Sequence, residues 1–197
     1  MDNEQKELFG AWVQAFGTTL AAVGSTPLKQ FSERELTSFN LWGNVLQGTG
    51  NALMADSEED YTLNKIGNQI QALGNVTVVG GIVLDLDNNT AQTLDIKGNL
   101  MQALGGSAAL SETIGEEPSA EIFYAFYGNI LQIIGNSMQA IGGIIDLRGG
   151  EGDNINIAGS WIQAAGSIIQ AIGISKFQLD ETGTKDENFL FPQVSQG

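Results

Sequence analysis

The chain has 197 residues, of which 42% are hydrophobic and only 16% are charged, and its 23 acidic residues outnumber 8 basic ones to give a formal charge of −15. This length suits one domain with a substantial core, and the charge argues against binding to nucleic acid or anionic lipid. Because the chain has no cysteine and no histidine, it lacks disulfides, thiolate or imidazole metal ligands, a thiol nucleophile and a histidine base.

One seven-residue motif recurs six times along the chain. Its first position is glycine and its second is asparagine or another small residue. Two mostly apolar residues and a glutamine follow. The sixth position is a small residue, often alanine, and the seventh is an apolar residue before the next glycine. The copies begin 24 to 33 residues apart, at Gly10, Gly43, Gly67, Gly98, Gly128 and Gly159. Self-similarity at this spacing is typical of repeat proteins, and the heptad period is typical of supercoiled helices.

The boundary residues predict helices in chain order. We expect six of them, over residues 4–24, 33–55, 58–84, 90–110, 118–147 and 154–175. Ser32 and Glu35 form a capping box before the second helix, Ser57 and Asp60 have the same relation before the third, and Pro118 suits a first helical turn. The short connections imply antiparallel neighbours. The sequence therefore predicts an all-α fold, an antiparallel bundle or layered hairpin array of about six helices built from a repeat of roughly 30 residues.

Each predicted helix has two distinct sides. On a helical wheel, the apolar positions of the heptad gather on one side and asparagine and glutamine on the other. In the fifth copy the apolar side holds Ile130, Leu131, Ile134 and Met138. We expect this side to point into a common core, and we expect the tryptophans on it to fill that core. These tryptophans are Trp12, Trp42 and Trp161.

The glycines inside the helices require an explanation. Each costs about 1 kcal/mol relative to alanine, so another interaction must compensate. We expect close contact between helices, in which the missing side chains let the backbones approach. The candidate close-contact residues are Gly17, Gly74, Gly105, Gly135 and Gly166. Terminal glycines such as Gly24 also suit helix C-caps.

The amide side is unusual because an exposed helix side normally carries charged residues. Five long stretches of the chain contain no charged residue at all: residues 8–28, 36–55, 66–84, 122–145 and 154–175. The amide side forms a candidate interaction face of Asn44, Gln47, Asn68, Gln71, Asn99, Gln102, Asn129, Gln132 and Gln163. Three environments fit such a face. It is buried against helices of this chain or of an oligomer, it is solvated, or the helices enter or lie on a membrane.

No residue pattern predicts catalysis, a cofactor or a metal ion. The stretch from Asp85 begins like a calcium loop, but its sixth and twelfth positions are Thr90 and Ile96 instead of glycine and glutamate. We therefore predict a non-enzymatic structural or interaction protein that forms homo-oligomers. A conditionally membrane-inserting or lipid-binding protein, similar to helical pore formers, is the alternative. The N-terminus lacks a secretory signal pattern, which predicts a cytoplasmic location.

The last residues depart from the repeat. We expect one helical domain over residues 1–178 and an extended arm over 179–197, which docks on its own chain through Phe189, Leu190 and Phe191.

The recurring "GNxLQAxGN" text and the opening "LFGAWVQAFG" resemble an uncharacterised family of repetitive helical proteins from low-GC Gram-positive bacteria. The resemblance spans most of residues 7–175 and implies no activity.

Overall fold

The computed structural model describes the backbone of residues 1–114, 117 and 119–190, and the side chains of these residues up to Phe177. Within these ranges the chain forms six helices and no strand, so the all-α prediction is confirmed. The helices are α1 (Asn3–Ser25), α2 (Glu33–Ser57), α3 (Leu63–Val83), α4 (Asn88–Thr113), α5 (Ala120–Leu147) and α6 (Asp153–Leu190).

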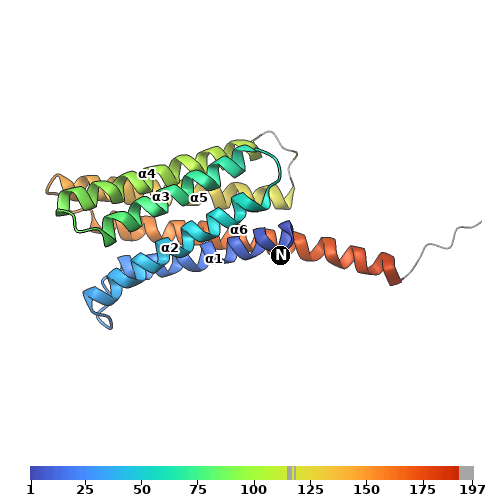
Figure 1. Ribbon diagram of the computed structural model, residues 1–197, viewed down its shortest axis with the longest axis horizontal. Helices are drawn as coiled ribbons and strands as arrows, with labels where there is room; N and C mark the ends of the chain where they lie inside the picture. Colours follow the sequence, from blue (N-terminus) through green and yellow to red (C-terminus); the bar gives the residue numbers. More distant parts are fainter. Residues whose placement is uncertain (115–116, 118, 191–197) are drawn as a thin grey trace, which may run out of the picture.

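The six helices form a closed ring of antiparallel neighbours, which we call the barrel (Figure 1). Each helix packs against the helices before and after it, and α6 packs against α1 to close the ring. Contact is closest within three hairpins, α1–α2, α3–α4 and α5–α6. Among the described residues, helices that are not neighbours in the ring make no close backbone contacts. The space along the axis is therefore filled by side chains alone.

Polar caps decide where the helices begin. Ser32 accepts a hydrogen bond from the backbone N–H of Glu35, whose carboxylate accepts one from the backbone N–H of Ser32, as predicted. The predicted start of the third helix at residue 58 is wrong. The hydroxyl of Ser57 donates to the carbonyl of Met54 as α2 ends, and Thr62 caps α3 instead. The fifth helix begins at Ala120, and Pro118 lies outside the described residues.

The predicted extended arm is helical over most of its length. Helix α6 runs without interruption through residue 179 to Leu190, and Figure 1 shows its last turns continuing beyond the ends of the other helices. The side chains of Phe189 and Leu190, and all of Phe191, lie outside the described residues, so their docking stays a prediction.

Glycines allow the two helices of each hairpin to touch. A methyl carbon on Gly74 would lie 2.7 Å from the carbonyl oxygen of Gly98, and one on Gly98 would lie 2.6 Å from that of Gly74. Real Cβ atoms do not approach other atoms this closely. The same reciprocal contact recurs in the pairs Gly10–Gly50, Gly67–Gly105, Gly128–Gly166 and Gly135–Gly159. A methyl carbon on Gly17 would likewise lie 2.7 Å from the carbonyl oxygen of Gly43. All five candidate close-contact glycines therefore face a glycine of the partner helix.

The cap of α4 provides a test of local stability. Asp87 accepts hydrogen bonds from the hydroxyl of Thr90 at 2.6 Å and from its backbone N–H at 3.0 Å. These bonds, the hydroxyl first, hold the pKa of Asp87 below its ordinary value of 3.8. A carboxyl group with a lowered pKa stabilises the fold above the unfolded-state pKa and loses that effect as the pH falls through the folded-state value.

We expect Asp87→Ala to lower the thermal midpoint at pH 7 by a few degrees, because the cap is lost. The difference from the native chain should shrink as the pH falls below 3.8. Asp87→Asn is the control, since asparagine is also a good cap and should keep the native midpoint at pH 7. Thermal unfolding followed by circular dichroism measures the midpoint of each variant. If both variants lower the midpoint equally, the lost cap is not the cause.

Candidate functional site

The interior of the barrel is lined by amide side chains. All nine residues of the candidate interaction face are buried, each at most 6% exposed: Asn44, Gln47, Asn68, Gln71, Asn99, Gln102, Asn129, Gln132 and Gln163. They face other helices of the same chain, so they offer no surface to a second copy. The buried apolar side chains are mostly alanine; of those described, only Met54, Val78 and Ile96 are larger.

Further polar residues belong to the same interior. Gln14, Asn51, Asn75 and Asn136 are at most 2% exposed, and the hydroxyl residues Thr18, Ser160 and Ser167 are at most 1% exposed. The repeat contained the signal for the amides among them. Gln14 holds the glutamine position of the first copy, and each of the three asparagines directly follows a heptad glycine.

Glutamines meet at the axis of the barrel. Gln14 in α1 donates from Nε2 to Oε1 of Gln132 in α5 at 3.0 Å. Gln163 in α6 donates from Nε2 to Oε1 of Gln47 in α2 at 2.9 Å and to Oε1 of Gln102 in α4 at 3.1 Å. None of these helix pairs are neighbours in the ring. The three bonds therefore cross the centre, and we call the five glutamines the central glutamine layer.

Three of these buried amides have polar atoms without a hydrogen-bond partner. Among the described residues, these atoms are Oε1 of Gln14, Oδ1 of Asn75 and both side-chain polar atoms of Asn136. Buried polar atoms without partners are rare in native proteins and commonly mark a place for water or an ion.

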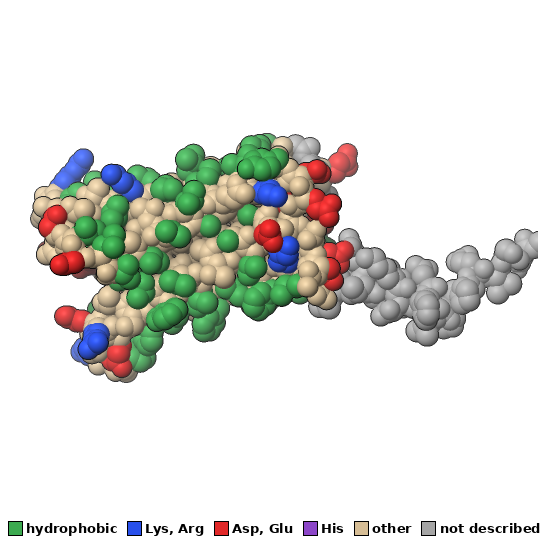
Figure 2. Space-filling view, in the orientation of Figure 1, with side chains coloured by type: hydrophobic (Ala, Val, Ile, Leu, Met, Phe, Trp, Pro, Cys, Tyr) green, Lys and Arg blue, Asp and Glu red, His purple; other side chains and the backbone are tan. Residues whose placement is uncertain are grey.

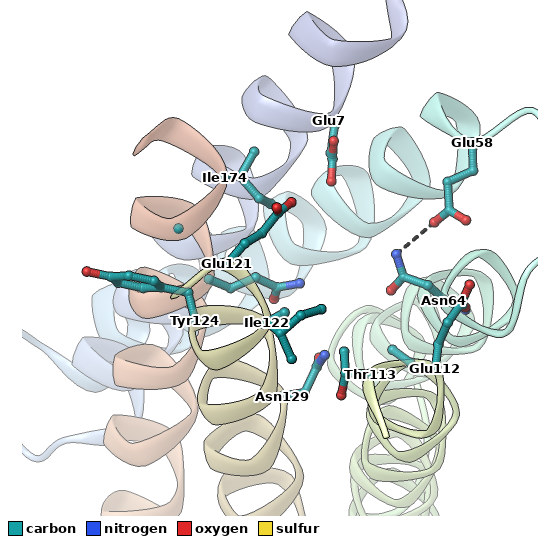
Figure 3. Close-up of a pocket in the computed structure, with 14 residues that line it drawn as sticks. Glu7, Glu58, Asn64, Glu112, Thr113, Glu121, Ile122, Tyr124, Asn129 and Ile174 are labelled. Carbon is teal, nitrogen blue, oxygen red and sulfur yellow. Dashed lines mark hydrogen bonds between the residues drawn. The ribbon is translucent and has the colours of Figure 1, made fainter. Parts of the chain in front are cut away.

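A cavity of about 360 Å³ opens at the end of the barrel where α1, α3 and α5 begin. Carboxylates from four parts of the chain line this glutamate cavity: Glu7, Glu58, Glu112 and Glu121. Figure 3 shows Glu7 and Glu121 reaching from different helices toward one space. The carboxylate of Glu112 accepts a hydrogen bond from the backbone N–H of Asn64 at 2.6 Å, and that of Glu58 accepts one from the side chain of Asn64 at 2.8 Å. Asn129 and Gln170 form part of its inner wall.

A second cavity, of about 250 Å³, opens at the opposite end. All six helices line it, with Ser25 from α1 and Val78 from α3 among its walls. Its polar residues are mainly amides: Asn40, Asn44, Gln92, Asn99, Gln139 and Asn156, with one carboxylate, Asp95. We call it the asparagine cavity. The central glutamine layer thus lies between two polar cavities.

The outer surface is apolar, which corrects the expected orientation of the helices. Ile134, from the side predicted to form the core, is 44% exposed. The three tryptophans predicted as core fillers, Trp12, Trp42 and Trp161, are 44–59% exposed. Figure 2 shows apolar side chains over the middle of the molecule and charged ones at its two ends. Because small residues and amides fill the narrow interior, the large apolar side chains point outward.

The same division between an amide interior and an apolar exterior runs through all six helices, and one family model matches the chain across this whole region, over residues 5–171. The chain belongs to DUF6944, a family of unknown function. This agrees with the expected resemblance to an uncharacterised family, whereas the low-GC Gram-positive source stays a prediction. The DUF6944 match begins in the first turn of α1, covers α2 to α5 and ends at residue 171 within α6. No curated protein and no solved structure matches the chain.

Proposed function

We propose that the protein is a membrane-embedded six-helix barrel with a polar interior. The observation that carries this proposal is the apolar outer surface, which all six helices share. Exposed large apolar residues include Phe16 in α1, Trp42 in α2, Val76 in α3, Leu104 in α4, Ile141 in α5 and Ile172 in α6. Since the helices form a closed ring, this surface surrounds the axis.

The distribution of this surface favours lipid over a second copy of the chain. A dimer interface covers one patch, typically about 800 Å² on each partner, and leaves the opposite side exposed to water. Lipid covers every side of a protein that spans a bilayer. Self-association, the role expected from the sequence, remains the second candidate because several copies could also cover apolar surface.

The dimensions also fit a bilayer. The five long uncharged stretches have 19 to 24 residues, which correspond to about 30 Å of helix at 1.5 Å per residue, close to the thickness of the hydrocarbon core. The shorter uncharged stretch of α4 covers residues 98–111. Charged residues flank these stretches, and Figure 2 shows them at both ends of the barrel.

Within the part of the chain that the structure describes, two helices are long and apolar enough to span a membrane by composition, α5 and residues Asp153–Phe177 of α6. Only 33% and 44% of their most apolar windows are buried, whereas a core helix of a soluble protein is mostly buried. The amides of the other helices lower their average hydropathy, yet these amides lie inside the barrel. An average over residues therefore understates how apolar the outer side of each helix is.

Several polar groups on the outer surface form hydrogen bonds within the chain, as a lipid environment favours. The indole N–H of Trp12 donates to the hydroxyl of Ser175 at 2.8 Å, and that of Trp161 donates to the hydroxyl of Thr26 at 3.0 Å. The exposed hydroxyl of Thr49 donates to a carbonyl one turn earlier in its own helix, at 2.8 Å. Small residues at the contacts between helices are likewise typical of membrane bundles.

This proposal assigns a non-enzymatic role without a cofactor, and it replaces the expected cytoplasmic location with a membrane. The negative charge predicts binding to neutral phosphatidylcholine rather than to anionic lipid.

Tryptophan fluorescence tests the proposal with the native chain. The protein is mixed with phosphatidylcholine vesicles, floated on a density gradient, and compared in vesicles with plain or brominated acyl chains. We expect it to float and its fluorescence to be quenched by bromine, because Trp12, Trp42 and Trp161 face outward. A discrete oligomer that neither floats nor is quenched would overturn the proposal in favour of self-association.

A further inference from the structure

We propose that the axis of the barrel is a conduction path for small monovalent cations such as K⁺ and Na⁺, closed here by the central glutamine layer. This inference rests on the proposed membrane location, because a path between two cavities transports ions only where the ends face different compartments.

Hydrogen-bonded amides lead from each cavity to the centre. From the glutamate cavity, Gln170 accepts a bond from Gln132 at 2.7 Å, and Gln132 accepts one from Gln14. From the asparagine cavity, Gln139 donates to Gln163 at 2.9 Å, and Gln163 donates to Gln47 and Gln102. The two chains of amides approach the axis from opposite ends and together form the central glutamine layer.

The centre offers an oxygen ligand that no residue uses. Gln14 is 2% exposed and its Nε2 bridges Asn51 and Gln132, at 2.7 and 3.0 Å, which fixes the amide across the axis. Its Oε1 has no hydrogen-bond donor among the described residues. Neutral carbonyl oxygens are the ligands that replace the water shell of alkali cations in selective channels. A cation that sheds its water shell could bind to this Oε1 atom, and a water molecule could donate a hydrogen bond to it.

The sign of the permeating ion follows from the cavities. The glutamate cavity carries Glu7, Glu58, Glu112 and Glu121, the asparagine cavity carries Asp95, and neither has a lysine or arginine among its described lining residues. Negative charge at both entrances raises the local concentration of cations and lowers that of anions. The amides themselves both donate and accept, so they add no preference for either sign.

The path opens by side-chain movement alone. The bonds that close the axis join flexible glutamines, while the backbones on either side are held by the glycine contacts within each hairpin. Rotation of the glutamines toward the cavities would open the centre without separating the helices.

Current across planar phosphatidylcholine bilayers tests this inference, with flotation of each preparation measured in parallel. We expect the native chain to conduct K⁺ in preference to Cl⁻ by about tenfold, as a reversal potential in a KCl gradient shows. Gln14→Ala should raise the conductance, because the shorter side chain leaves room at the axis for water that can hydrate the ion. Gln14→Leu should lower it, because its apolar side chain still fills the centre and offers no oxygen ligand. Gln69→Leu, in a half-buried position on an outer groove between α2 and α3, should conduct like the native chain.

The cavity charges are tested by neutralisation. Glu121→Gln should reduce the preference for K⁺ over Cl⁻, while Glu151→Gln, on the exposed connection before α6 and outside both cavity linings, should leave it unchanged. Protein that floats with vesicles but carries no current would overturn the conduction path and leave the membrane proposal standing. Equal conductance in both Gln14 variants, each folded by circular dichroism, would also overturn it. Protein that does not float would overturn both proposals.

Discussion

Replacement of Gly74 by alanine is expected to destabilise the barrel by about 1–3 kcal/mol, the usual cost of overpacking a close contact. This outcome is opposite to the intrinsic preference, because alanine stabilises a helix by about 1 kcal/mol relative to glycine. The added methyl group would lie 2.7 Å from the carbonyl oxygen of Gly98. A backbone oxygen cannot rotate away, so α3 and α4 would have to separate and lose dispersion contacts along the hairpin.

Gly80→Ala is the matched control in the same helix. The nearest heavy atom to a methyl group there is a side-chain carbon of Leu84 at 3.9 Å, an ordinary contact. This variant should be more stable than the native chain, by up to about 1 kcal/mol. Thermal unfolding in one detergent, followed by circular dichroism, compares the two. If both variants gain stability, the interior glycines are not close-contact residues and their cost has another explanation.

The sequence predicted the two sides of each helix but not their direction. The heptad places amides opposite apolar residues whatever surrounds the molecule, because this depends only on the helical period. Which side points inward depends on the space available and on the solvent. The glycine contacts draw the hairpins together, so the interior admits alanine and amides. Ile134 and Trp42 therefore lie outside, which is the reverse of the orientation expected in water.

The start of α2 was predictable from its cap. Ser32 and Glu35 have no competitor, and α2 begins where the capping box predicts. Before α3, Ser57 and Thr62 are both good caps. Helix α2 continues to Ser57, and Thr62 caps α3. The extended arm was predicted because the heptad pattern ends near residue 178. Residues 179–190 contain no proline to stop a helix, and α6 continues through them.

The candidate site could be predicted in part. Every amide proposed from the repeat lies in the interior, because one period places them all on one side. The two cavities could not be predicted, since each combines residues from helices that are distant in sequence. Their positions depend on the closure of the ring by α1 and α6, which no local pattern records.

The single substitution Gln163→Leu is expected to destabilise the barrel by about 2–4 kcal/mol. The side-chain oxygens of Gln47 and Gln102 each accept a hydrogen bond from Gln163, and both would become buried acceptors without this donor. Leaving a buried donor or acceptor without a partner costs about 1–3 kcal/mol, more than the roughly 1 kcal/mol that a typical hydrogen bond contributes. The amide of Gln139 also loses its bond to Gln163, but it is half-buried beside the asparagine cavity, where water can replace the partner.

The triple variant with leucine at residues 47, 102 and 163 should recover most of this loss. Replacing all partners of a buried polar contact by apolar groups of similar size is often neutral or stabilising. The triple variant therefore separates the two roles of these glutamines, since it should remain folded and float with vesicles but conduct no K⁺. Thermal unfolding of the single and triple variants in the same detergent measures the recovery. A triple variant that loses three times as much stability as the single one would show that the glutamines contribute independently, rather than as one bonded layer across the axis.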